Sequence, residues 1–204
     1  MFKAQSFPVY FARHGETLNN VAQRWQGRND SPLTPRGEKQ ARETGLILKD
    51  LISTAHPPLF VASPLGRTRA TMEIALLTLG LPRDAYTTED RLMEVDLGEW
   101  TGLPADDVRI HDKARFEARS RDRWNVPCPG GESYAMVAAR AEDWLARLTG
   151  PTVAVSHGVF GRILRCLYAG LPWQQIAEMD EPHGAVFRLE RGTVARFDGA
   201  PRVP

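Results

Sequence analysis

VYFARHGETLNN, the stretch from residue 9 to residue 20, ends an apolar run at the triplet Arg13-His14-Gly15. The run from Pro8 to Ala12 carries the valine and aromatic residues that favour a β-strand. Polar residues compatible with a helix follow the triplet at once. A charged side chain and a titratable one therefore stand where a predicted strand ends, and this arrangement needs a chemical explanation.

Short apolar runs alternate with longer segments of helical period along the rest of the chain. Further strands are predicted at residues 59–62 and 152–155, and helices at residues 34–51, 63–79, 133–148 and 157–168. Residues 185–189 and 193–197 are typical of a hairpin. The alternation predicts an α/β fold with a mainly parallel sheet covered by helices. Because the 204 residues contain no linker-like stretch, we expect one domain over residues 1–204.

Residues 83–131 resist this interpretation, because aromatic, charged and proline residues mix there without a single period. Only residues 105–123 are predicted to be partly helical. This part of the chain holds four arginines and three acids, namely Arg115, Arg119, Arg121, Arg123, Asp112, Glu117 and Asp122. A basic helix near a pocket would bind a polyanionic substrate, but the interleaved acids favour a solvated surface helix, which is our prediction.

The overall composition excludes several classes of function. Formal charge is +1, from 26 basic and 25 acidic residues, so no global field draws the chain to nucleic acid or anionic lipid. No apolar run reaches membrane-spanning length and no signal peptide is legible, so we expect a cytoplasmic protein. Cys128 and Cys166 lie outside any zinc-binding or disulfide pattern, so reduced thiols and no metal or other cofactor are expected. Nothing in the sequence indicates an oligomeric state.

Three predicted strands are each followed by a similar set of polar groups. Arg13-His14-Gly15 follows the first strand, Ser63-Pro64-Leu65-Gly66-Arg67 the second and Ser156-His157-Gly158 the third. Because the carboxyl ends of parallel strands lie at one edge of a sheet, two arginines and two histidines should converge there. Taken singly, each histidine is better explained as a core residue, and each arginine as an ion pair with Glu16 or Glu94. These explanations do not suit the four residues together, because a cluster of positive charge without carboxylate partners is costly to bury.

A phosphate monoester matches such a cluster. It carries about −1.5 to −2 charges near pH 7 and three acceptor oxygens, and guanidinium groups pair with such oxygens bidentately. Helix N-termini near Gly15, Pro64 and Gly158 would add backbone N–H donors. The sequence therefore predicts a small phosphorylated substrate as the partner of this site.

Chemistry on the phosphate requires a reactive group. A neutral histidine offers a ring nitrogen as nucleophile near pH 7, so His14 is the candidate, and His157 would donate to the developing charge. The departing oxygen needs a proton from a carboxyl group, whose pKa rises beside phosphate oxygens through like-charge repulsion. Glu94, Asp96 and Glu99 all lie in residues 91–102, and spacing does not choose among them.

Five ordered motifs in this chain resemble those of the histidine phosphatase superfamily, in its phosphoglycerate mutase-like branch. They are Arg13-His14-Gly15-Glu16-Thr17 with Asn20, Gln26-Gly27 and Ser31-Pro32-Leu33-Thr34-x-x-Gly37-x-x-Gln40-Ala41; Ser63-Pro64-Leu65-x-Arg67-x-x-x-Thr71; Leu92-x-Glu94-x-x-x-Gly98-x-Trp100-x-Gly102; Pro129-Gly130-Gly131-Glu132-Ser133; and Val155-Ser156-His157-Gly158. Arg-His-Gly alone would be a weak signal, whereas five motifs in order are specific.

The resemblance implies a three-layer α/β/α sandwich and a role for each site residue. His14 would be the phosphorylated nucleophile, Arg13, Arg67 and His157 the phosphate pocket, and Glu94 the proton donor. Asn20 and the pair Gln26 and Gly27 correspond to positions that often contact the phosphate or line the substrate, and the backbone at Gly158 would add to the pocket. No metal belongs to the mechanism of the family.

The resemblance leaves two activities open. The segment between the acid motif and Pro129-Gly130-Gly131 is shorter than in typical cofactor-dependent phosphoglycerate mutases, so we expect a phosphoric monoester hydrolase of the histidine phosphatase type that uses water as acceptor. A cofactor-dependent phosphoglycerate mutase is the alternative enzyme. A non-catalytic phospho-ligand binding module is the alternative of another class, although a pure binder has no reason to keep Glu94.

Several polar and aromatic residues near these motifs are interpreted as structural. Trp25 and Trp100 are expected to pack rather than to line the substrate, and His183 is assigned to a turn. Ser63 and Ser156 are expected to tie the backbone near the pocket, since neither belongs to a legible relay of histidine and carboxylate.

Overall fold

Six strands form one sheet in the computed structural model of the protein, which describes residues 5–199. The strands are β1 (Val9–Arg13), β2 (Leu59–Ala62), β3 (Thr87–Thr88), β4 (Thr152–Ser156), β5 (Val186–Glu190) and β6 (Thr193–Phe197). Their order is β3-β2-β4-β1-β5-β6, with parallel pairing from β3 to β1 and antiparallel pairing from β1 to β6. The expected mainly parallel sheet and the hairpin at its edge are confirmed.

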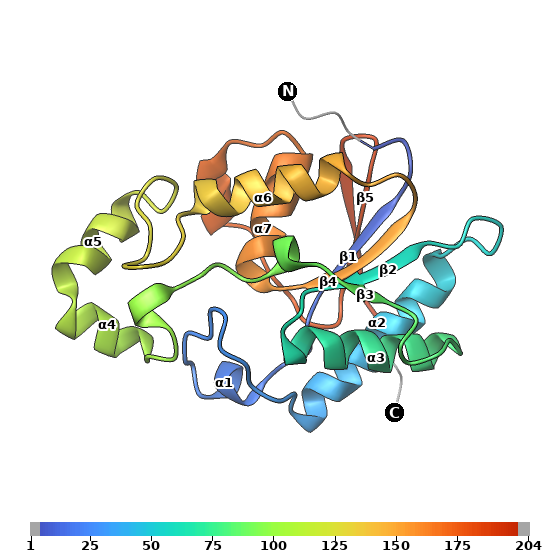
Figure 1. Ribbon diagram of the computed structural model, residues 1–204, viewed down its shortest axis with the longest axis horizontal. Helices are drawn as coiled ribbons and strands as arrows, with labels where there is room; N and C mark the ends of the chain where they lie inside the picture. The colour runs from blue at the N-terminus through green and yellow to red at the C-terminus, as the bar shows by residue number, and fades with distance from the viewer. Residues whose placement is uncertain (1–4, 200–204) are drawn as a thin grey trace.

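Helices cover both faces of this sheet (Figure 1). The α-helices are α1 (Leu18–Val21), α2 (Pro35–Leu51), α3 (Gly66–Leu79), α4 (Ala105–His111), α5 (Lys113–Arg121), α6 (Tyr134–Ala146) and α7 (Gly158–Tyr168), and the 3-10 helices are η1 (Asp90–Leu92), η2 (Gly98–Trp100) and η3 (Trp173–Ala177). Helices α2 and α3 lie on one face and α6 and α7 on the other. The three-layer α/β/α sandwich is therefore confirmed.

The central strand β1 is buried on both of its faces. Val9 and Phe11 belong to the apolar cluster beneath α6 and α7, whereas Tyr10 and Ala12 belong to the cluster beneath α2 and α3. Alternate side chains of a strand point to opposite faces, so a strand between two helical layers must be apolar at every position. This explains why the sequence shows a continuous apolar run and not an alternating one.

The predicted elements agree with the observed ones to within a few residues. Helix α2 begins as expected, with Pro35 at its first position and the Thr34 hydroxyl accepting from the Gly37 amide at 3.0 Å. Strand β1 includes Arg13, one residue beyond the predicted end. Helix α3 starts at Gly66 rather than at Ser63, because Leu65 is still extended with φ −68° and ψ 141°. The Ser-Pro-Leu segment is therefore a loop that leads into the helix.

Within residues 83–131, β3 pairs with β2 and Leu92 of η1 belongs to the core beneath α6 and α7, whereas η2, α4 and α5 form a group of short elements beside the sandwich (Figure 1). The helix predicted over residues 105–123 is two helices, α4 and α5, with the break at Asp112, whose carboxylate accepts from the Trp100 indole at 2.7 Å. Trp100 forms a small cluster of buried residues with Val108 and Cys128, separate from the two main clusters. The group has its own core, which accounts for the missing long-range period.

Three further properties of the described residues bear on the sequence-based expectations. Cys128 and Cys166 are both buried and free. Among residues 5–199, none of the helices combines the length and the apolar composition that a bilayer crossing requires. Three or more His, Cys, Asp or Glu side chains do not gather anywhere in this range in a way that could hold a metal ion.

Two glycines hold the loop after β1 against the start of α2. A Cβ added at Gly15 would collide with the backbone carbonyl of Gly37, and a Cβ added at Gly37 would collide with the carbonyl of Glu16. The two backbones can approach this closely only because both residues lack a side chain. The glycine of the Arg-His-Gly triplet is thus required for packing.

We expect Gly37→Ala to lower the free energy of unfolding by about 1–3 kcal/mol, because the added methyl group meets backbone that has no room to move. Chemical denaturation with urea measures the change. The matched control is Gly150→Ala, since a Cβ at Gly150 meets nothing within 4 Å. Equal stability of the two variants would contradict the close contact.

Candidate active site

The ends of three parallel strands bring the predicted residues together. The His14 amide donates to the Ser156 carbonyl at 3.0 Å, which extends the β1–β4 ladder by one residue. The Ser63 amide donates in the same way to the Val155 carbonyl at 3.0 Å. As a result the rings of His14 and His157 lie edge to face with centroids 5.3 Å apart. The convergence expected from the sequence is present.

His14 is held as a neutral ring with one free nitrogen. Its side chain is buried, and Nδ1 lies 2.8 Å from the Gly15 carbonyl oxygen. A carbonyl only accepts, so Nδ1 carries the proton and Nε2 keeps its lone pair. Burial, followed by the charges of Arg13 and Arg67, holds the pKa of His14 well below its usual value. A ring in this state can act as a nucleophile without a general base.

The two arginines bind backbone carbonyls in preference to carboxylates. Arg13 donates from Nη1 to the Glu181 carbonyl at 2.7 Å. Arg67 donates to the carbonyls of Gly27 and Asn29 at 2.8 and 2.7 Å, and its ion pair with Asp30 is long, at 3.5 Å. Ion pairs with Glu16 or Glu94, the alternative explanation, are absent among the described residues. Burial is the largest cause that lowers the pKa of both guanidinium groups, yet both remain charged near pH 7.

His157 lies beside His14 and is not among the residues that line the pocket. Its side chain is fully buried, Nε2 lies 2.8 Å from the Ser63 hydroxyl, and Nδ1 has no partner among the described residues. Burial and the charge of Arg67 hold the pKa of His157 well below its usual value. Ser63, assigned to the backbone by the sequence, thus orients the second histidine. Ser156 does bind backbone, donating to the Leu92 carbonyl at 2.6 Å.

Glu94 is the acidic residue of its segment that faces the pocket. Its carboxylate accepts from the amides of Val95, Val159 and Phe160 at 3.0 to 3.1 Å, the last two at the N-terminus of α7. Asp96 instead caps the Gly98 amide at 2.8 Å and pairs with Arg28 at 3.2 Å. Glu99 pairs with Arg115 at 3.1 Å on the surface. The geometry selects the same carboxylate as the sequence motifs.

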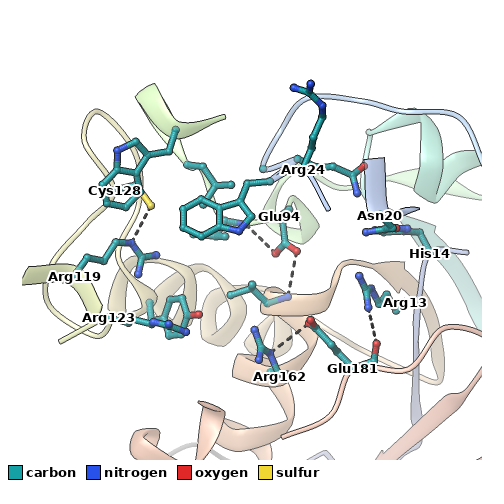
Figure 2. Close-up of a pocket in the computed structure, with 18 of the residues that line it drawn as sticks. Arg13, His14, Asn20, Arg24, Glu94, Arg119, Arg123, Cys128, Arg162 and Glu181 are labelled. Atoms are coloured by element: carbon teal, nitrogen blue, oxygen red, sulfur yellow. Dashed lines mark hydrogen bonds and ion pairs between the residues drawn. The ribbon is translucent and has the colours of Figure 1, made fainter. Parts of the chain in front are cut away.

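These groups open onto one pocket of about 280 Å³ (Figure 2). The predicted residues that line it are Arg13, His14, Asn20, Gln26, Gly27, Arg67 and Glu94. His157 and Gly158 are the two predicted residues that do not line it. Asn20 also accepts from the amide and hydroxyl of Thr17, both at 3.0 Å, so it caps α1 as well. The side-chain amide oxygen of Gln26, Oε1, is buried without a partner among the described residues.

Known proteins resemble this chain over most of its length. A family model described as "Histidine phosphatase superfamily (branch 1)" matches residues 9–195. The chain belongs to this superfamily. A "Probable phosphoglycerate mutase GpmB" from Erwinia tasmaniensis is 36% identical over 169 residues, which cover 80% of this chain and 75% of the relative.

Solved structures of the superfamily share the fold. An alpha-ribazole phosphatase from Shigella flexneri superposes with a TM-score of 0.81 at 24% identity, covering 97% of this chain and 98% of the other. A mycobacterial glucosyl-3-phosphoglycerate phosphatase superposes with a TM-score of 0.77 at 26% identity, covering 94% and 96% of the two chains. The relatives thus include proteins named as mutases and as phosphatases.

The superfamily pocket in this chain has an aromatic wall that the sequence did not predict. Trp25, Trp100 and Phe116 all line it, with ring centroids 6.0 to 6.5 Å apart. The interpretation of Trp25 and Trp100 as packing residues only is therefore incomplete. They pack against one another and also face the pocket, because Trp25 comes from the loop after α1 and packs against the small cluster that contains Trp100.

The arginines of residues 115–123 divide between two environments. Arg115 pairs with Asp112 at 2.8 Å and Arg121 with Glu117 at 3.3 Å, both on the surface as predicted. Arg119 and Arg123 line the pocket instead. The prediction of a solvated surface residue is wrong for Arg119, which is buried on the side of α5 that packs toward Cys128, whereas Arg123 follows α5 and is exposed as predicted.

His183 is a further member of the site: it lies in a bend before Gly184, as the sequence predicts, and it also reaches the backbone of His14. Nδ1 lies 2.6 Å from the His14 carbonyl oxygen and the two rings are 5.6 Å apart. Nδ1 therefore donates, which fixes the backbone of the nucleophile. Burial, followed by the charge of Arg13, lowers the pKa of His183 to about 4. Its proximity to the hairpin that pairs with β1 was the available signal.

The lowered pKa of His183 predicts a loss of stability in acid. Above pH 6.5, its ordinary pKa, the folded and unfolded states both keep it neutral. As the pH falls from 6.5 toward about 4, the unfolded state takes up a proton that the folded state does not. The free energy of unfolding should then fall by about 1.4 kcal/mol per pH unit for this residue alone.

The variant His183→Asn tests this, because an amide nitrogen can still donate to the His14 carbonyl. We expect urea denaturation across this pH range to show a shallower slope for the variant than for the wild type. The exposed His56→Asn is the matched control for loss of an imidazole. An unchanged slope in His183→Asn would contradict a neutral buried imidazole.

Proposed function

We propose that the protein is a metal-independent phosphomonoester hydrolase that acts on a small phosphorylated metabolite through a phosphohistidine at His14. The observation that carries this proposal is the state of the His14 ring. It is neutral, its Nδ1 proton is engaged by the Gly15 carbonyl, and its free nitrogen belongs to a residue that lines the pocket. A nucleophile in this state, with two guanidinium groups beside it, matches a phosphate ester.

In the first half-reaction Arg13 and Arg67 bind the phosphoryl oxygens. They supply the positive charge that metal ions supply in other phosphoryl-transfer sites. The Nε2 lone pair of His14 attacks phosphorus, and the bond from phosphorus to the departing oxygen breaks. Glu94 gives its proton to that oxygen, so that a neutral alcohol leaves. His157, packed edge to face on His14, restrains the ring during the transfer.

In the second half-reaction the Glu94 carboxylate takes a proton from water. The water oxygen attacks phosphorus, the bond from phosphorus to Nε2 breaks, and inorganic phosphate leaves with His14 neutral again. Glu94 is thus returned to its protonated form, and the protons balance over the cycle. Each step uses a group that lines the pocket.

A phosphoglycerate mutase is the second candidate, favoured by the 36% identity to the relative of that name. A mutase must keep water from the phosphorylated histidine and return the phosphoryl group to a second oxygen. The short segment between the acid motif and Pro129-Gly130-Gly131 supports hydrolysis, because few residues are available to cover the site. Formation of 2-phosphoglycerate from 3-phosphoglycerate and a bisphosphorylated primer would favour the mutase.

We expect His14→Ala to reduce hydrolysis of p-nitrophenyl phosphate to the background rate, because no other neutral imidazole faces the pocket among the described residues. Colorimetric release of nitrophenolate measures the rate. Circular dichroism verifies the fold, and the exposed His56→Ala is the matched control. Wild-type protein should also form an acid-labile phosphoenzyme that the variant lacks. Turnover by His14→Ala near the wild-type rate would refute the mechanism, and a wild type without phosphoenzyme or turnover would favour the binding module.

Glu94→Gln should impair alkyl phosphates most, because an alkoxide cannot leave without a proton, whereas nitrophenolate can. General acid catalysis is typically worth about 10²–10⁴ in rate, and a loss of that size is expected for the alkyl esters. The measurement is kcat/KM for both ester classes, with Glu99→Gln as control because Glu99 is exposed and paired with Arg115. Equal losses for both classes would remove the proton-donor role from Glu94.

A further inference from the structure

Six arginines line the pocket, which is more than a single phosphate group can use. They are Arg13, Arg24, Arg67, Arg119, Arg123 and Arg162. Arg13 and Arg67 are assigned to the phosphoryl group above. Arg162 is paired with Glu181 at 3.4 Å, and the exposed Arg24 donates to the Gly102 carbonyl at 3.0 Å. Arg119 and Arg123 are left without a carboxylate partner among the described residues.

Arg119 is the informative member of this pair because it is buried. Its side chain is 7% exposed, Nε donates to the Cys128 thiol at 2.9 Å, and the guanidinium carbon lies 5.2 Å from the centre of the Tyr134 ring. Burial raises the pKa of the Cys128 thiol, so the sulfur is neutral near pH 7 and is not a counter-ion. A buried guanidinium whose charge is not balanced is costly unless an anion joins it.

The position of Arg119 excludes the phosphate of the reacting ester as that anion. Figure 2 shows Arg13 and His14 at one side of the pocket and Arg119, Arg123 and Cys128 at the other, with Glu94 between them. The aromatic wall of Trp25, Trp100 and Phe116 also lines the pocket. The pocket therefore has two positively charged ends and an apolar wall.

We propose that the departing group of the substrate carries a second anionic group, a carboxylate or a phosphate, which binds Arg119 and Arg123. This rests on the proposed hydrolase activity and narrows its substrate to esters with two separated anions. The apolar wall accommodates the atoms that join the two anions, and Cys128 and Tyr134 hold the Arg119 guanidinium in place for the distal one. Arg123, which is exposed, adds a second guanidinium at the pocket rim.

A series of ω-carboxyalkyl phosphates of increasing chain length tests the proposal, each compared with its ω-carbamoyl counterpart of the same size. At the length that spans the pocket, kcat/KM should be about tenfold to a hundredfold higher for the carboxylate, the range expected of a hydrogen bond between charged groups. Arg119→Met should abolish this preference while hydrolysis of the carbamoyl esters continues. Arg123→Gln should reduce it. Replacing carboxylate by phosphonate identifies which anion is preferred.

Arg121→Gln is the matched control, because Arg121 lies on the same helix but pairs with Glu117 on the surface. Its preference should equal that of the wild type. Equal kcat/KM for carboxylate and carbamoyl esters at every length would overturn the distal site and leave the hydrolase proposal intact. If neither series is hydrolysed, the hydrolase proposal fails. Isothermal titration calorimetry with His14→Ala protein then decides the distal site: tighter binding of the carboxylate supports it, and equal binding overturns it.

Discussion

The site depends on the backbone ladder that holds β1 between β4 and β5. Because β1 and β4 are parallel and paired in register, Arg13 lies opposite Ser156. The residue that follows each strand is a histidine. The His14 amide continues the ladder by one hydrogen bond. On the other side, the segment that leads into β5 supplies His183, which binds the His14 carbonyl. Both polar groups of the His14 peptide backbone are thus fixed before any ligand binds.

Backbone carbonyl oxygens accept hydrogen bonds from Arg13 and Arg67 without neutralising the positive charge of the two guanidinium groups. Arg13 has no ion pair among the described residues and the pair of Arg67 with Asp30 is long, so no close carboxylate neutralises the charge that a phosphate needs. Carbonyl oxygens of Gly27, Asn29 and Glu181 accept the hydrogen bonds and carry no net charge. The same field of arginines, together with burial, keeps the two histidines neutral. Binding strength and nucleophilicity therefore arise from one arrangement.

The sequence predicted what local patterns determine. Apolar runs located the buried strands, Thr34 and Pro35 marked the start of α2, and the strand ends placed Arg13, His14, Arg67 and His157 at one edge. It did not predict the roles of Trp25, Trp100, Arg119 and His183, because each depends on which neighbours the side chain meets in the folded chain. Some of these contacts join distant segments, such as those of Trp25 with Trp100 and of His183 with His14, and no local period records them. The acidic residues interleaved with the arginines of residues 115–123 led to the prediction of a fully solvated helix. Arg121 does pair with an acid on the surface, but Arg119 is buried against Cys128.

The small cluster of Trp100, Val108 and Cys128 packs apart from the two cores that sandwich the sheet. The buried side chains of this cluster, which lie beside the pocket, are therefore not those that pack around β1, although Leu97 packs against both groups. Evolution or an engineer can vary the rim without disturbing the strands. New specificities are therefore accessible through replacements around this small cluster, while the residues at the edge of the sheet stay as they are.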